Sequence, residues 1–249
     1  MIILKSREEI ENIKEASKIV AKVLYDIEEY IKPGVSTKKL NDIIDRMIRK
    51  MGGSPAFLGY KGYPASSCIS INEEVVHGIP SENKILEEGS IVKIDVGVNK
   101  NGFFGDGAKT YKVGKVNGDL ERLLQVTEKA LYIGIDKARA GNRVGDIGFE
   151  IQQFVECEGF SVVRELAGHG VGHYLHEEPV VPNYGKRGEG PLLKKGLVIA
   201  IEPMVNMGSH EVKVLRDKWT IVTLDGKPSA HFEHTVLIDD EPIILTTLD

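Results

Sequence analysis

Ile91-Val-Lys-Ile-Asp-Val-Gly-Val-Asn-Lys-Asn-Gly-Phe-Phe-Gly-Asp106 is the stretch of this chain that most constrains its fold. Asn101-Gly102 separates two apolar runs, and this dipeptide is the strongest short signal for a two-residue type I′ hairpin. With that loop, Lys100 pairs with Phe103, and the continued register places Gly97 opposite Asp106. Asp95 lies two residues from Gly97 on the same face, so the two aspartates become diagonal neighbours with backbones about 7–8 Å apart.

This pair of aspartates predicts a cation site. Two carboxylates in such a position repel each other, or one of them takes up a proton. A shared divalent cation removes the conflict. The prediction depends on the loop length, because a change of one residue would move the two side chains to opposite faces of the hairpin.

Two further acids lie within or beside apolar strands. Glu202 interrupts the apolar run 197–205, and Glu233 immediately precedes the apolar run 234–238. Acids are rare in strands because burying a carboxylate without a partner is costly. A half-exposed position or a salt bridge would explain any one of them, but Lys93 is the only base on a strand close to them in sequence.

Apolar periodicity around the hairpin indicates an α+β fold. A capping-box pattern opens a helix at Ser6 that Pro33-Gly34 ends, and a second helix runs from Ser36 or Thr37 to Gly52-Gly53. Two more helices are predicted at 119–140 and 146–158. Strands are predicted at 68–71, 91–98, 103–113, 160–163, 197–205, 219–224, 232–238 and 242–245. No linker divides the chain, so residues 1–249 are interpreted as a single domain.

The composition excludes several classes of protein. A net charge of -5, with no cluster of lysine and arginine, argues against direct nucleic-acid binding. No segment approaches ~18 apolar residues, so no membrane span is expected. The apolar run Met1 to Leu4 is too short for the apolar region of a secretory signal. Two cysteines, Cys68 and Cys157, are too few for a disulfide framework and indicate a reducing compartment. We expect a cytoplasmic protein.

Histidines concentrate in Gly168-His-Gly-Val-Gly-His-Tyr-Leu-His-Glu-Glu-Pro179. His169 and His173 have the spacing of a helical zinc pair, but the three intervening and flanking glycines disfavour a helix there. The same glycines also suit a phosphate-binding loop, although no Walker A or Gly-x-Gly-x-x-Gly pattern accompanies them. Serine catalysis lacks a Gly-x-Ser-x-Gly sequence. We interpret His169 as the nitrogen ligand for a metal.

Taken in chain order, Asp95, Asp106, His169, Glu202 and Glu233 form a series that resembles the type I methionine aminopeptidases. Each lies in a matching local motif, and the resemblance covers essentially the whole chain. The motifs are Lys93-Ile-Asp-Val-Gly97, Gly102-Phe-Phe-Gly-Asp106, Gly168-His-Gly-Val-Gly172, His176-Glu-Glu-Pro179, Ile201-Glu-Pro-Met204 and Phe232-Glu-His-Thr235, with Cys68-Ile-Ser-Ile-Asn72 and Val76-His-Gly-Ile-Pro80.

The resemblance implies a pita-bread fold, in which a central antiparallel sheet with flanking helices forms two pseudo-symmetric halves. It also implies two divalent metal ions between the halves. Asp95, Asp106 and Glu233 would hold one metal, and Asp106, His169, Glu202 and Glu233 would hold the other. A site of four carboxylates and one imidazole suits cobalt, manganese, iron or zinc without selecting among them.

The implied reaction is hydrolysis of the bond after an N-terminal initiator methionine when the second residue is small, by a water bridged between the metals. Glu202 would accept the proton of that water, and His77 and His176 would contact the substrate near the scissile bond. The residues that match the methionine pocket are Phe57, Tyr60, Tyr63, Cys68, His77, Leu175 and Trp219. Phe57, His173 and Leu175 depart from the residues that other members carry.

Further expectations come from the same resemblance. A monovalent cation would be held by the backbone near Asn72, Glu74 and Ser229. The substrates would be N-termini of nascent polypeptides, with the ribosome as the place of encounter. The enzyme would be a monomer.

Four alternatives remain beside this interpretation. Prolidase and aminopeptidase P share the ligands but carry an additional N-terminal domain, for which a first helix at Ser6 leaves no room. Type II methionine aminopeptidases carry an inserted subdomain that 249 residues hardly accommodate. A non-catalytic binding module on this scaffold would have lost ligands, whereas all five are present. A purely structural metal would not need the nearby histidines.

Overall fold

The computed structural model describes residues 2–248, and the two ends of the predicted domain, Met1 and Asp249, lie outside the described residues. Within that range the chain forms four α-helices, each begun by a local cap: α1 Arg7–Asp26, α2 Thr37–Lys50, α3 Gly118–Lys137 and α4 Val144–Cys157. At α1, Ser6 Oγ accepts a hydrogen bond from Glu9 N, while the Glu9 carboxylate accepts one from Ser6 N at 2.6 Å. This capping box satisfies two amides that otherwise have no partner in the helix.

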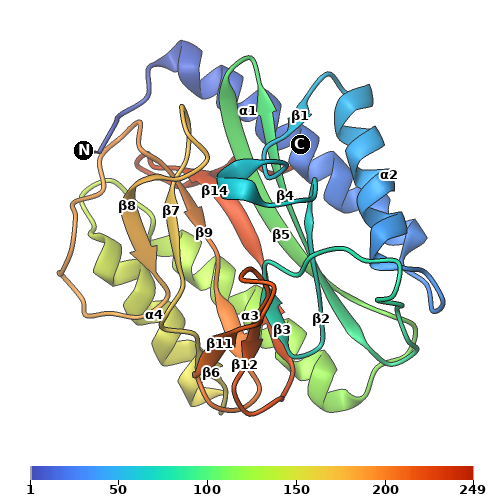
Figure 1. Cartoon of the computed structure of the whole chain (residues 1–249). Coiled ribbons are helices and arrows are strands. Elements are labelled where there is room, and N and C mark those ends of the chain that lie inside the picture. The colour runs from blue at the N-terminus through green and yellow to red at the C-terminus, as the bar shows by residue number, and fades with distance from the viewer. Residues whose placement is uncertain (1, 249) are drawn as a thin grey trace.

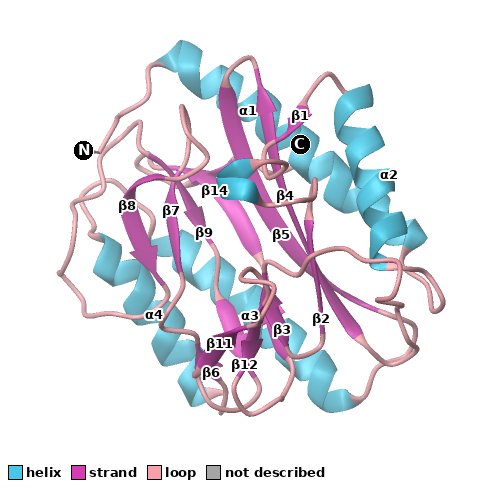
Figure 2. Cartoon of the chain, viewed as in Figure 1, coloured by secondary structure: helices cyan, strands magenta, loops and turns pink. Residues whose placement is uncertain are grey.

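A nine-stranded, largely antiparallel sheet forms the centre of the molecule (Figures 1 and 2). Its strand order is β1-β4-β5-β14-β9-β7-β8, with β2 paired to β4 and β15 paired to β14. The strands are β1 Ser54–Pro55, β2 Cys68–Ile71, β4 Ile91–Lys100, β5 Phe103–Lys112, β7 Ala167–Gly170, β8 Glu177–Pro182, β9 Val198–Ile201, β14 Glu233–Leu237 and β15 Ile243–Ile244.

Two small sheets accompany the central one. The first has the order β13-β10-β6, and the second has the order β11-β12-β3. Their strands are β3 Glu74–Val76, β6 Ser161–Val162, β10 Met204–Asn206, β11 Val212–Val214, β12 Ile221–Thr223 and β13 Ser229–His231. Short 3₁₀ turns, η1 Ile27–Tyr30 and η2 Tyr60–Gly62, complete the elements.

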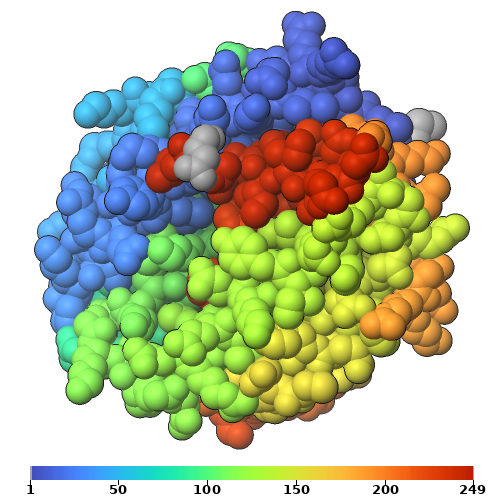
Figure 3. All heavy atoms as spheres, turned by 180° about the vertical axis from the view of Figure 1, so that it is seen from behind, coloured from blue at the N-terminus to red at the C-terminus, as the bar shows by residue number. Residues whose placement is uncertain are grey.

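The helices cover one face of the sheet in two pairs. In Figure 1 the sheet lies in front of them, and Figure 3, seen from behind, shows α1 and α2 in blue on one side and α3 and α4 in yellow-green on the other. α1 packs on β4 and β5, whereas α3 packs on β9 and β14. Each pair closes its own apolar core, one around Val20 and Ile94 and the other around Leu123 and Ile199, and both are fully buried. The two pairs therefore define two halves joined through the central sheet.

The predicted hairpin register is confirmed. Lys100 pairs with Phe103, Gly97 pairs with Asp106, and the Asn101-Gly102 loop has positive φ at both residues. Positive φ at both positions is the signature of the type I′ turn that matches the twist of the flanking strands.

The predicted strand 197–205 is wrong as one continuous element. β9 ends at Ile201 and β10 begins at Met204 in a different sheet. Pro203 has no N–H to donate to a ladder, and it also restricts the backbone of the residue before it. The break releases Glu202 from the ladder, so that this acid lies at the end of a strand and not within one.

Several other boundaries differ from the predictions. The first helix changes from α-helical to 3₁₀ at Ile27, and α4 begins at Val144, two residues earlier than expected. β1, β3, β7, β8, β11 and β13 lie in segments for which no strand was predicted. Each has at most six residues, which is too few to establish a regular apolar period.

Candidate metal centre and substrate cavity

The predicted metal ligands come from five neighbouring strands of the central sheet. Asp95 lies on β4, Asp106 on β5, Glu233 on β14 and His169 on β7, while Glu202 directly follows β9. In the strand order these elements read β4-β5-β14-β9-β7 without interruption. The sheet therefore collects residues separated by more than a hundred positions in the sequence.

Strand register places the carboxylates on one face. Ala108 of β5 pairs with Asp95 on one side and with Glu233 on the other, so these three residues form one row across the sheet. Asp106 lies two residues from Ala108 along β5 and points to the same face. The small side chain of Ala108 leaves the space between the three acids open.

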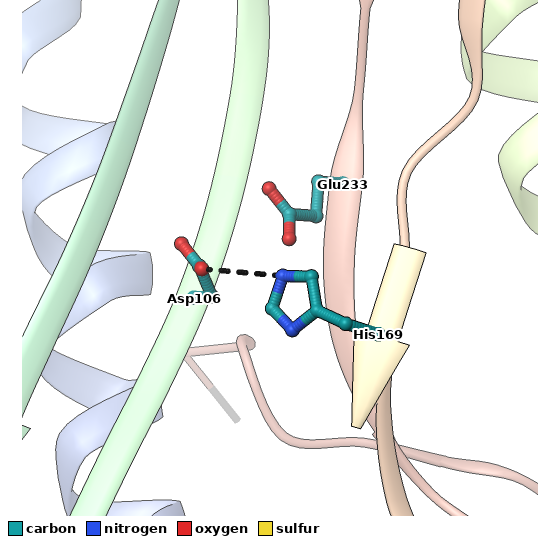
Figure 4. Close-up of side chains that lie close together, drawn as sticks. All are labelled: Asp106, His169 and Glu233. Carbon is teal, nitrogen blue, oxygen red and sulfur yellow. Dashed lines mark ion pairs between the residues drawn. The ribbon is translucent and has the colours of Figure 1, made fainter. Parts of the chain in front are cut away.

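Donor atoms of Asp106, His169 and Glu233 lie within 4.8 Å of one another, and all three residues are buried (Figure 4). His169 Nδ1 lies 2.9 Å from the carbonyl oxygen of Gly170, which suits an N–H donor at that atom. Its Nε2 lies 3.5 Å from Glu202 Oε1 and 3.8 Å from Asp106 Oδ2. Burial lowers the pKa of His169 to about 4, so the ring is neutral and its Nε2 lone pair faces carboxylate oxygens.

The chemistry of this cluster fits a divalent cation. Asp95 Oδ1 and Glu233 Oε1 are buried and have no hydrogen-bond partner among the described residues. Burial first, and then the charges of neighbouring acids, raise the pKa of Asp106, Glu202 and Glu233 well above its usual range. Acceptors facing acceptors in a dry site need positive charge between them. Carboxylates with one imidazole supply the donor set of such a metal.

Neighbouring side chains hold the ligands in place. Thr235 Oγ1 donates to the Asp106 carbonyl at 2.7 Å and accepts from Asp106 N at 3.0 Å. Gly107 N donates to Asp106 Oδ1 at 3.0 Å. Asn183 Nδ2 donates to the Glu202 carbonyl at 3.0 Å. Contacts of this kind fix the orientation of a ligand before a metal binds.

His231 lies beside the cluster and was not predicted. Its Nε2 lies 3.8 Å from Glu202 Oε2 and 3.9 Å from Glu233 Oε2, and neither ring nitrogen has a partner among the described residues. Burial lowers the pKa of His231 to about 3. The only signal in the sequence was proximity, because His231 stands two residues before Glu233, at the end of the three-residue strand β13.

All the predicted site residues except Leu175 border one cavity of about 160 Å³. We call the carboxylates and His169 the floor of this cavity and the other lining residues its walls. Phe57, Tyr60, Tyr63, Cys68 and Trp219 make the walls largely apolar. Leu175 instead packs behind the wall in one buried cluster with Phe57, Tyr63 and Cys68. The structure adds Lys61, whose side chain also borders the cavity.

Close packing explains the shape of the wall. A Cβ at Gly97 would come within 2.5 Å of the Phe57 ring, so glycine at this position lets the ring approach the strand. Tyr63 meets the Trp219 ring edge-on at 5.1 Å between centroids, and its hydroxyl donates to the Gly78 carbonyl at 2.9 Å. Burial raises the pKa of the Cys68 thiol well above its usual range, so Cys68 contributes an apolar surface and not a thiolate.

His77 and His176 line the same cavity but are not among the predicted metal ligands. The His176 ring stacks on Tyr60 at 5.2 Å and lies 4.1 Å from the His169 ring centroid. Burial lowers the pKa of His176 to about 3, and burial also lowers the pKa of His77. His77 has a φ of 57°, a left-handed conformation that a non-glycine residue seldom adopts. Both rings are neutral and keep an N–H for a ligand in the cavity.

The glycine-rich segment is a strand and not a phosphate loop or a helix. A Cβ at Gly168 would meet Ala200 O at 2.3 Å, and one at Gly170 would meet Glu178 O at 2.4 Å. These glycines therefore permit β7 to lie close to its neighbours. His173 points away from the floor, and its Nε2 contacts Glu9 Oε1 at 2.9 Å, which removes the zinc-helix interpretation.

Without metal, the cluster should make stability depend on pH. Burial raises the pKa of Asp95 to about 7, so between about pH 4 and pH 7 the folded chain binds more protons than the unfolded chain. Stability is therefore present at the acid end of this window and is lost as the pH rises. We expect Asp95→Asn to raise the melting temperature in EDTA at pH 8 by about 2–4 °C, measured by calorimetry.

The same substitution should weaken divalent-metal binding, because it removes a charged ligand. An Asp95→Asn protein whose melting temperature in EDTA changes with pH as steeply as the unsubstituted chain would contradict this account.

Comparison with known proteins agrees with the geometry. Residues 11–240 match the profile of metallopeptidase family M24. The chain is 51% identical over 240 residues to methionine aminopeptidase 1 of Bacillus subtilis, covering 96% of both chains. The crystal structure of a methionine aminopeptidase from Thermotoga maritima superposes with a TM-score of 0.98 at 45% identity, covering 99% of this chain and 100% of the other.

A more distant neighbour bears on one of the alternatives. A prolidase from Pyrococcus furiosus superposes with a TM-score of 0.81 at 25% identity. The match covers 99% of this chain but 66% of the prolidase. The two proteins share the pita-bread fold, which confirms the predicted fold class, and the prolidase has additional chain outside it.

Proposed function

Because this chain belongs to metallopeptidase family M24 and, within it, to the methionine aminopeptidases, we propose that it removes the initiator methionine from polypeptides whose second residue is small. The observation that carries the proposal is the meeting of two features in one cavity. Buried acceptor groups form its floor, and an apolar aromatic wall stands beside them.

The proposed site holds two divalent cations, drawn from cobalt, manganese, iron and zinc. Asp95, Asp106 and Glu233 would hold one, and Asp106, His169, Glu202 and Glu233 the other. The chemistry supplied by two such cations is a lower pKa for a water at the cluster and stabilisation of the oxyanion formed on the amide.

The residues of the chain carry out the proton transfers and the positioning. The Glu202 carboxylate lies 3.5 Å from His169 Nε2 and keeps 14% of its side chain exposed. It accepts the proton that the attacking water loses. His176 is neutral because burial lowers its pKa, so it donates an N–H to the developing oxyanion and does not act as an acid. His77 donates to the substrate amide and orients it.

The wall favours methionine as the first residue. An unbranched thioether makes contacts with aromatic rings worth ~0.3–1.5 kcal/mol, and Tyr63 and Trp219 present such rings. No carboxylate stands in the wall among the described residues, and Lys61 at the cavity repels a basic side chain. The metals and carboxylates would anchor the free α-amine, which restricts cleavage to the N-terminal residue.

Peptide hydrolysis tests this function. We expect rapid cleavage of Met-Ala-Ser and Met-Gly-Ser, and at least ~10-fold lower kcat/KM for Met-Ile-Ser and Leu-Ala-Ser, since one methylene alone changes specificity by that order. N-acetyl-Met-Ala-Ser serves as the control without a free amine. Equal kcat/KM for Met-Ile-Ser and Met-Ala-Ser would overturn the selectivity, and efficient cleavage of Xaa-Pro dipeptides would favour the prolidase alternative.

The setting is proposed on similar grounds. Both cysteines are free, which suits a reducing cytoplasm. One chain supplies every residue of the cluster, so residues 1–249 are proposed to work as one catalytic domain in a monomer. Among the described residues no helix has the length and apolar character needed to cross a membrane. The proposed substrates are nascent polypeptides, encountered at the ribosome.

A further inference from the structure

Lys93 is a buried base behind the metal cluster that the proposed mechanism does not use. It lies on β4 two residues before Asp95, with Ser70 and Thr110 opposite it on the neighbouring strands. Its exposed fraction is 1%. Lys93 Nζ donates to the carbonyl of Asn72 at 2.6 Å and to that of Ser229 at 3.0 Å. Within residues 2–248, no carboxylate lies within ion-pairing distance of this nitrogen.

These two carbonyls belong to a junction of three segments. Asn72 occupies the turn between β2 and β3 with a φ of 47°, and its side-chain oxygen accepts from Ile91 N at 3.0 Å. Ser229 begins β13, and its amide donates to the Asn72 carbonyl at 3.0 Å. From this junction β4 leads to Asp95, β3 leads to His77, and β13 leads to Glu233. A group that binds both carbonyls therefore links the three segments that lead to Asp95, His77 and Glu233.

A monovalent cation does not fit at this junction. The family resemblance implied such an ion against the backbone near Asn72, Glu74 and Ser229, but Lys93 Nζ already lies against the oxygens of Asn72 and Ser229. The Glu74 side chain is also engaged, since it accepts from Ile71 N at 2.9 Å and pairs with Lys84. An ion and the lysine nitrogen would compete for the same two acceptors.

We propose that Lys93 Nζ takes the place of a monovalent cation at this junction, so that the chain binds no K⁺ or Na⁺ there unless the side chain is shortened. Burial lowers the pKa of Lys93 to about 7. The amine donates to carbonyls in either protonation state, so these two hydrogen bonds do not depend on the titration of Lys93. Carbonyl oxygens that accept an ammonium group are also the ligands that replace the hydration shell of K⁺. Shortening the side chain should therefore open a site for K⁺ or NH₄⁺.

The unsubstituted chain gives the first test. Protein carrying its divalent metal is dialysed against radioactive Rb⁺, a substitute for K⁺, and its melting temperature is compared in KCl and choline chloride of equal ionic strength. We expect no stoichiometric Rb⁺ binding and melting temperatures that agree within about 1 °C. One Rb⁺ bound per chain would overturn the proposal.

Shortening the side chain gives the second test. Lys93→Ala should lower the melting temperature in choline chloride by about 5–10 °C, because two buried carbonyls lose a donor. NH₄Cl or KCl should restore about 3–5 °C, as expected for a ligand that binds only the folded state.

Lys93→Met is the matched control. Its apolar side chain fills the space without a donor, so its melting temperature should fall without recovering in either salt. Recovery of Lys93→Ala no greater than that of Lys93→Met would also overturn the proposal. If Lys93→Ala does not fold, the Rb⁺ measurement on the unsubstituted chain still decides the question. Both tests measure ion binding or stability, so their results would stand even if the chain did not have the proposed peptidase activity.

Discussion

Glu233→Ala is expected to abolish hydrolysis of Met-Ala-Ser, with a loss in kcat/KM of more than ~10³-fold. Removing a group that only supports a metal ligand lowers metal affinity or activity by about 10–100-fold. A larger loss is expected for Glu233, because it is proposed to bind both metals directly. Its side chain is 3% exposed, and its Oε1 has no other partner among the described residues. The content of tightly bound divalent metal, measured by atomic absorption after dialysis, should fall in parallel.

Glu241→Ala is the matched control for this variant. Glu241 is a carboxylate with 74% of its side chain exposed that pairs with Arg139 far from the cavity, so both activity and metal content should remain unchanged. Full activity of Glu233→Ala would end the two-metal proposal.

The second large effect separates two neighbouring histidines. His169→Ala should lose metal affinity, because its Nε2 faces the carboxylates, whereas His176→Ala should keep its metal and lose about 10²-fold or more in kcat. The two ring centroids lie only 4.1 Å apart, so a general disturbance of the cavity would affect both variants alike. Calorimetric titration with a divalent metal and steady-state kinetics measure the two quantities.

His173→Ala supplies the control for this pair. His173 lies in the same glycine-rich segment but contacts Glu9 at the surface, so neither metal affinity nor kcat should change. Equal loss of metal affinity in His169→Ala and His176→Ala would show that the roles are assigned wrongly.

The hairpin around Asn101-Gly102 could be predicted because its information is local. Turn chemistry sets the loop length, the loop length sets the register, and the register determines which acids share a face. The four helices could be found for a similar reason, since caps and apolar periodicity act within a few residues. The positions of Asp95 and Asp106 relative to each other therefore needed no knowledge of the rest of the chain.

The remaining features depend on contacts between distant segments. The strand β7 was missed because Gly168 and Gly170 make room for the backbones of other strands, and a lone sequence does not say which backbone approaches. Lys93 was noted only as a base near acids, since its partners are main-chain carbonyls 21 and 136 residues away. His231 lies on a three-residue strand, too short to show a period.

The pairing of β5 with β14 sets the order in which the proposed active centre can be assembled during synthesis. β5 belongs to the half that is made first, and β14 lies near the end of the chain, yet the two are adjacent at the centre of the sheet. Asp106 and its partner Thr235 are separated by 129 residues. Asp95 and Asp106 are therefore synthesised long before Glu233, which the proposed cluster also needs. The proposed active centre therefore cannot form until β14 has been made and has joined the sheet beside β5.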